Sequence, residues 1–137
     1  MGMDLSGSAG EFWWDVFSWH KLLRVAQRYG WEPAGTVLAA AELEHMPGGV
    51  WSGGYTSNDF QRITAADAGQ LAEALERALC HISDADVLAS HRTDSGGIVI
   101  APDGPEIEDM DWFCGPESKQ RIRTFIRYCR TGAFTIG

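Results

Sequence analysis

The clearest pattern of apolar and polar positions lies in the middle of the chain and predicts an amphipathic helix that ends near Ile82. Apolar residues recur there at intervals of three and four, which places them on one helix face: Ala68, Leu71, Ala72, Leu75, Ala78, Leu79 and Ile82. Thr64 occupies the N-cap position, and Asp67 can accept hydrogen bonds from the free amides of the first turn. Glu73 and Arg77 are four residues apart on the outer face, so we expect an exposed ion pair there.

A second helix is predicted over residues 11–29. Its apolar stripe alternates steps of four and three, through Phe12, Val16, Trp19, Leu23 and Ala26. Gly30 then serves as a C-terminal cap residue and Pro33 as a stop. We expect the aromatic cluster of residues 12–19 to lie in the core. The alternative is a helix that docks its surplus aromatic side chains on a partner, because Trp is a favoured interface anchor.

A third helix is predicted to begin at Pro116, since a residue in the first turn needs no amide donor. Its core face is formed by Ile122, Phe125, Ile126 and Cys129. Gly132 is expected to cap it.

Short runs bounded by turn residues predict five strands, near residues 36–40, 52–55, 60–63, 98–100 and 133–136. The second and third of these runs are expected to pair as a hairpin around the turn Ser57-Asn58-Asp59. Residues 1–10 are rich in Gly and Ser, so a flexible leader is expected there. The predicted fold is α+β, with a single domain over residues 11–137 in which about three helices pack on a small, mostly antiparallel sheet.

Composition and charge narrow the classes of partner. The chain has 137 residues and a formal net charge of −8, which disfavours nucleic acid and favours a partner protein with a basic surface. No apolar run reaches the length of a membrane span, so no membrane partner is expected. The three cysteines are far apart and form no Cys-x-x-Cys pair, which indicates reduced thiols and a cytoplasmic location. Cys80 and Cys129 fall on apolar helix faces and are expected to be buried.

An acidic stretch at residues 101–118 is the main candidate for an interaction surface. It contains six carboxylates and no Lys or Arg, and its prolines and glycines predict a loop. In this interpretation the partner-binding residues are Glu106, Glu108, Asp109 and Asp111, with Trp112 and Phe113 as apolar anchors. The alternative is intramolecular: the carboxylates pair with the following helix, through Arg121, Arg123 and Arg127.

A second polar cluster precedes the central helix and consists of Tyr55, Asn58, Asp59 and Gln61. We expect it mainly to order the turn before Thr64, with a ligand-binding role as the alternative. No glycine-rich phosphate-binding motif is present, and the four histidines are scattered. We therefore predict no metal and no cofactor.

Three motifs in this chain resemble those of a group of small uncharacterised bacterial proteins. The first is Gly30-Trp31-x-Pro33-x-Gly35-Thr36. The second runs Trp51-x-Gly53-x-Tyr55-x-x-Asn58-Asp59-x-Gln61, with Phe60 at the position where a small residue, usually Gly, is expected. The third is Gly132-x-Phe134-x-Ile136, preceded by Phe125-x-x-Tyr128. The resemblance implies an immunity or toxin-neighbour protein and brings no catalytic residue with it.

These observations favour a non-catalytic, acidic binding protein, such as an immunity protein that neutralises a basic toxin. Two alternatives remain. One is a small enzyme that works through Asp59 and a histidine, which requires a concave pocket with a perturbed carboxylate. The other is a homodimeric accessory subunit that associates through the aromatic first helix.

Overall fold

The computed structural model describes residues 2–87 and 108–137, and it confirms the predicted α+β class. The sheet contains β1 (Gly2–Gly7), β2 (Gly10–Asp15), β3 (Gln61–Ile63) and β4 (Phe134–Ile136), in the order β2-β1-β4-β3 with antiparallel neighbours. The long helices are α1 (Val16–Arg28), α3 (Ala65–Leu79) and α5 (Pro116–Cys129). The short ones are α2 (Ala40–Leu43), α4 (Asp109–Trp112) and the 3-10 turn η1 (Pro47–Gly49). The predicted strand 98–100 lies outside the described residues.

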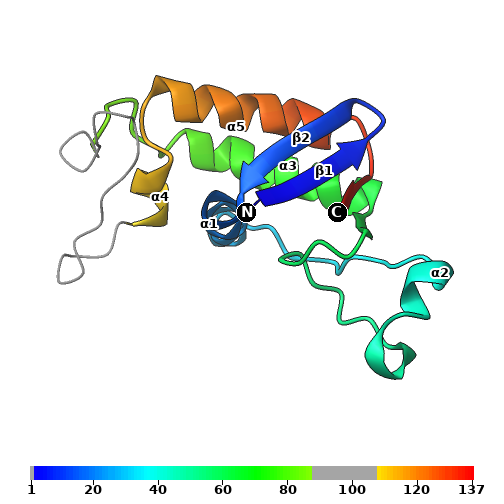
Figure 1. Ribbon diagram of the computed structural model, residues 1–137. Coiled ribbons are helices and arrows are strands. Elements are labelled where there is room, and N and C mark those ends of the chain that lie inside the picture. Colours follow the sequence, from blue (N-terminus) through cyan, green and yellow to red (C-terminus); the bar gives the residue numbers. More distant parts are fainter. Residues whose placement is uncertain (1, 88–107) are drawn as a thin grey trace, which may run out of the picture.

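The prediction of a flexible leader at residues 1–10 is wrong for residues 2–10, which form most of a β-hairpin. Met3 and Leu5 are buried in β1, whereas Asp4 and Ser6 are exposed. This alternation with a period of two is the signature of a half-buried strand, and the Gly- and Ser-rich composition masked it. β1 lies in the interior of the sheet, between β2 and β4 (Figure 1).

The first helix starts later than predicted, since residues 10–15 form strand β2. Trp14 is buried and Trp13 is about half exposed, so neighbouring side chains point to opposite faces. Asp15 then caps the helix, and its carboxylate accepts from the amide of Ser18 at 2.8 Å. Phe12 and Val16 are four residues apart by coincidence, so the apolar spacing of the helix seemed to extend into the strand that precedes it.

The strands at residues 61–63 and 134–136 are confirmed, but they pair with each other and not with residues 52–55. The predicted strand at 36–40 is reduced to one bridge between Val37 and Arg62, and no strand forms at 52–55. Side-chain hydrogen bonds join these two ranges instead; for example, the Thr36 hydroxyl donates to the Gly54 carbonyl at 2.6 Å. In Figure 1 the middle of the segment between α1 and β3, which carries α2, extends away from the sheet and the long helices.

Helices α3 and α5 pack against each other, and α5 supports one face of the sheet. Phe125 of α5 contacts the rings of Phe12 and Trp14 from β2 and the ring of Phe134 from β4. Thr64 caps α3 as predicted, accepting from the Asp67 amide at 3.2 Å.

Two side-chain predictions on α3 are corrected. Arg77 donates to the carbonyl of Tyr29 at 2.7 and 2.9 Å, so it anchors the end of α1 where an ion pair with Glu73 was expected. All three thiols are free, but Cys80 is exposed, whereas Cys114 and Cys129 are buried.

Candidate interaction surface

A buried hydrogen-bond network centred on Asp67 joins three segments that are distant in sequence. The Asp67 carboxylate accepts from Trp31 Nε1 at 2.9 Å and from the Tyr55 hydroxyl at 2.5 Å. Trp31, Tyr55 and Asp67 are all at most 8% exposed. The carboxylate also receives a long bond of 3.4 Å from the amide of Ala34. Asp67 was predicted to accept from its own helix turn, and that prediction is wrong.

Tyr55 extends this network beyond Asp67. Its hydroxyl accepts from the Gly35 amide at 2.8 Å, and its carbonyl accepts from Trp19 Nε1 at 2.7 Å. Burial, followed by the hydrogen bond to Asp67, raises the pKa of the Tyr55 hydroxyl well above its ordinary value. The hydroxyl is therefore a neutral donor that fixes the 31–60 segment against α1 and α3. One signal in the sequence points to this network. Asp67 lies four residues before Leu71, on the apolar face of α3, and a carboxylate buried there needs hydrogen-bond donors.

The other members of the predicted cluster order the turn before β3. Gln61 is fully buried, and its side-chain amide donates to the Ser57 carbonyl at 2.6 Å. Its Oε1 accepts from the Asp59 amide at 2.9 Å. Asn58 is exposed and donates to the Gly2 carbonyl at 3.1 Å, which ties the turn to β1.

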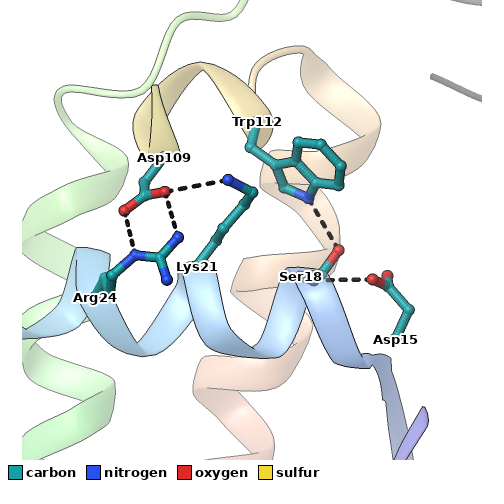
Figure 2. Close-up of polar contacts among 6 residues, drawn as sticks. All are labelled: Asp15, Ser18, Lys21, Arg24, Asp109 and Trp112. Atoms are coloured by element: carbon teal, nitrogen blue, oxygen red, sulfur yellow. Dashed lines mark hydrogen bonds and ion pairs between the residues drawn. The ribbon is translucent and has the colours of Figure 1, made fainter. Parts of the chain in front are cut away.

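The acidic stretch is not a plain loop, because residues 109–112 form helix α4, which docks on α1 (Figure 2). Asp109 pairs with Arg24 at 2.8 Å and with Lys21 at 3.4 Å. The hydrogen bond from Arg24 is the main cause that lowers the pKa of Asp109, against a smaller opposing effect of burial. The partners of Asp109 thus come from α1, whereas the intramolecular alternative had placed them on the last helix.

The predicted aromatic anchors also make contacts within the fold. Trp112 Nε1 donates to Ser18 Oγ at 3.0 Å, and the Lys21 ammonium lies 5.0 Å from the centre of the same indole ring (Figure 2). Phe113 is 3% exposed and meets the ring of Trp14 edge-on. Glu108 is exposed, Asp111 is partly exposed, and Glu106 lies outside the described residues.

Phe60 has an unusual backbone. Its φ of 62° lies in the left-handed region, and within the described part of the chain Phe60 is the one non-glycine residue with a positive φ. This conformation costs an L-residue about 1–2 kcal/mol, which explains why a small residue is expected there. The side chain is 60% exposed, so burial offsets little of this cost. Its ring lies against Gly137, where an added Cβ would come within 2.7 Å of Phe60 Cδ1.

The outward face of the sheet carries Phe60, Trp13 and an acidic set of side chains. Asp4 of β1 lies across from Trp13 of β2, and its carbonyl accepts from the Gly137 amide at 2.7 Å. Trp13 is 49% exposed, and its indole lies over Gly2, where a Cβ would collide with it. Asp4 therefore has the exposed ring of Trp13 across from it on one side. On the other side it has Gly137, against which the ring of Phe60 lies. We call this surface the outer sheet face; its side chains are Asp4, Ser6, Glu11, Trp13, Phe60, Arg62 and Thr135.

A shallow hollow of about 320 Å³ opens on this face, lined in part by Asp4, Ser6, Glu11 and Trp13. Arg62 is the cation that β3 contributes, in the row that runs through Thr135 and Ser6 to Glu11. The sequence prediction missed the outer sheet face because it assigned β1 to a leader and β2 to a helix.

Within residues 2–87 and 108–137, no three His, Cys, Asp or Glu side chains are grouped so that they could hold a metal ion. In the same ranges, none of the helices combines the length and apolar character needed to cross a membrane. Comparison of the chain with protein-family models, with curated proteins and with solved structures gives no significant match. The resemblance to immunity or toxin-neighbour proteins stays a prediction.

Proposed function

We propose that this chain is a non-catalytic binding protein whose outer sheet face binds a basic surface of a partner protein. Phe60 carries the proposal. Its backbone is strained and its ring is largely exposed, so neither local conformation nor core packing accounts for a phenylalanine at this position. Strained residues that persist in a fold concentrate at functional sites. Two exposed aromatic rings on one face of a sheet provide the anchors that protein interfaces favour.

The charges of the outer sheet face support a basic partner. Asp4 and Glu11 are exposed on it beside a single cation, Arg62, in a chain whose net charge is −8. An arginine of the partner can pair with Asp4 while its guanidinium stacks on the indole of Trp13, because a guanidinium combines an ion pair with a planar contact on an aromatic ring. The fold already uses the aromatic part of this chemistry, since the Arg121 guanidinium lies 4.7 Å from the centre of the Trp14 ring. Long-range attraction between the acidic chain and a basic partner speeds association.

The particular form we propose is an immunity protein that covers a basic toxin. The three motifs that resemble toxin-neighbour proteins lead to this form. Two of them contribute residues to the Asp67 network and to the turn that presents Phe60. The motifs thus fix the scaffold, and the outer sheet face selects the partner.

The test is a titration of ¹⁵N-labelled protein with a hexa-arginine peptide, followed by amide chemical shifts. We expect binding in the range of about 0.1–1 mM at low salt, equivalent to roughly 4–5.5 kcal/mol from a few exposed contacts. The shifts should concentrate in β1, β2 and β4 and on Phe60. Asp4→Asn combined with Glu11→Gln should weaken binding about threefold to tenfold.

The matched control is Glu32→Gln combined with Glu73→Gln, which removes the same charge from exposed positions elsewhere. It should change the affinity by less than twofold. Equal losses in the two double variants would show attraction by net charge alone and contradict a site on the outer sheet face. Chemical-shift changes confined to α4 would place the interface on the acidic stretch instead of the outer sheet face.

For the immunity form, the partner is the product of a toxin gene adjacent to that of this chain. Co-purification with that product should be lost in the variant with Asp4→Asn and Glu11→Gln and kept in the control. The reverse pattern would contradict the immunity form of the proposal.

A further inference from the structure

Helix α5 carries a stripe of cations, although the chain as a whole is acidic. Lys119, Arg123, Arg127 and Arg130 follow one another at steps of four, four and three, so they lie along one side of the helix. They line a groove of about 550 Å³ between α5 and the end of α3. From Lys119 to Arg130 the stripe spans about 16 Å at 1.5 Å per residue, or three helical turns.

The two ends of the stripe are neutralised within the fold. Arg130 pairs with Glu76 of α3. Lys119, whose side chain is 8% exposed, donates to Asp84 at 2.7 Å and to the Ile82 carbonyl at 3.0 Å. The hydrogen bond from Lys119 is the main cause that lowers the pKa of Asp84.

The two arginines in the middle of the stripe differ from those at its ends. Both are exposed, and Arg127 makes a long bond of 3.4 Å to Thr124 Oγ1. Over residues 2–87 and 108–137, no salt bridge joins Arg123 or Arg127 to a carboxylate. After Lys119, Arg123 also helps to lower the pKa of Asp84. Neither guanidinium forms a salt bridge within these ranges, however, so two guanidinium groups one helical turn apart line the groove.

Apolar side chains lie beside these charges. Leu79, Ile82 and Ile126 line the groove between the two helices. A small anion requires no apolar lining, whereas a long groove that combines an apolar lining with a row of cations fits an amphipathic helix laid into it. Carboxylates four residues apart on such a helix match the spacing of Arg123 and Arg127.

We propose that the α3–α5 groove is a second interaction surface, which binds an acidic amphipathic segment of a partner protein through Arg123 and Arg127. It differs from the outer sheet face in location and in the sign of its charge. The two surfaces therefore recognise opposite chemistries.

The probe is a 14-residue amphipathic peptide of Leu, Ala and Glu with its Glu residues four apart, and the readout is again the amide shifts of labelled protein. We expect shifts in residues 76–82 and 119–130. Arg123→Gln combined with Arg127→Gln should weaken binding tenfold or more. Arg28→Gln combined with Arg62→Gln removes two exposed cations elsewhere and should change affinity less than twofold.

Three results would overturn the proposal. One is equal weakening in both double variants, which would mean attraction by charge alone. Another is equal binding of a scrambled peptide of the same composition. The last is full displacement of the peptide by millimolar inorganic phosphate, which would define a small-anion site. Since Arg123 and Arg127 are exposed, the unfolding midpoint of their double variant should match that of the wild type. If it does not, the deciding comparison is between the amide shifts of the wild type with the amphipathic peptide and those with the scrambled peptide.

Discussion

Removal of the Asp67 carboxylate should destabilise the chain strongly, because two buried donors depend on this one acceptor. Asp67→Ala leaves Trp31 Nε1 and the Tyr55 hydroxyl without an acceptor in positions that are 3% and 8% exposed. Each buried polar group left unpaired costs about 1–3 kcal/mol, so we expect a total loss of about 3–5 kcal/mol. For a chain of this size that lowers the melting temperature by roughly 10–20 °C.

Urea unfolding followed by tryptophan fluorescence measures this loss directly. Asp67→Asn should lose less, since its amide oxygen can still accept from Trp31 while its NH₂ group faces Tyr55. Asp59→Ala, on the turn that the same segment forms, is the matched control and should stay within about 0.5 kcal/mol of the wild type. A loss below about 1 kcal/mol for Asp67→Ala would refute the network as the anchor of residues 31–60.

Three further predictions concern reactivity and charge. Under native conditions one thiol, Cys80, should react rapidly with a thiol reagent, and the other two only after unfolding; rapid labelling of all three would contradict the burial. Stability should fall as pH rises above about 10, because the unfolded chain loses the Tyr55 proton there while the folded chain, with its raised pKa, retains it. Tyr55→Phe should make that fall shallower without abolishing it, because burial also raises the pKa of Tyr128; an unchanged slope would contradict the assignment. Asp109→Asn should cost up to about 1 kcal/mol through its pairs with Arg24 and Lys21, whereas exposed Glu108→Gln should cost almost nothing; equal costs would show that α4 does not depend on this pair.

Helices were the most predictable part of the fold. Local spacing identified α3 and α5, and residue type identified the Thr64 cap and the start at Pro116. These signals act over one or two turns, so they depend little on distant contacts. The short strands β3 and β4 were also found from local pattern, but not their pairing, because a three-residue strand contains too few side chains to specify its partner.

The N-terminal hairpin was missed for a different reason. Phe12 and Val16 satisfy a helical interval, and the pairing of β2 with β1, which is itself paired with β4, makes residues 10–15 extended. Tertiary context overrides local spacing at such a position.

The candidate site was less predictable than the fold. The sequence selected Tyr55 and Gln61 as notable, but their hydrogen bonds reach Asp67 and Ser57, and only the structure brings those groups together. It also flagged Phe60 as a departure from an expected small residue, and the φ of 62° gives that departure a physical meaning. The docking of α4 on α1 depends on contacts across more than 80 residues, which no local pattern encodes.

The most direct test of the binding account is Phe60→Gly measured for both stability and affinity. Glycine removes the strain of the left-handed backbone, about 1–2 kcal/mol, and adds about 0.5–1 kcal/mol of unfolded-chain entropy, so stability should stay equal or rise by up to about 1.5 kcal/mol. Affinity for the hexa-arginine peptide should fall at least fivefold because an anchor ring is lost. Phe17→Ala removes another exposed ring, 69% exposed and outside the outer sheet face, and should leave the affinity unchanged. A Phe60→Gly variant that is equally stable or more stable and binds the peptide as tightly as the wild type would contradict the account.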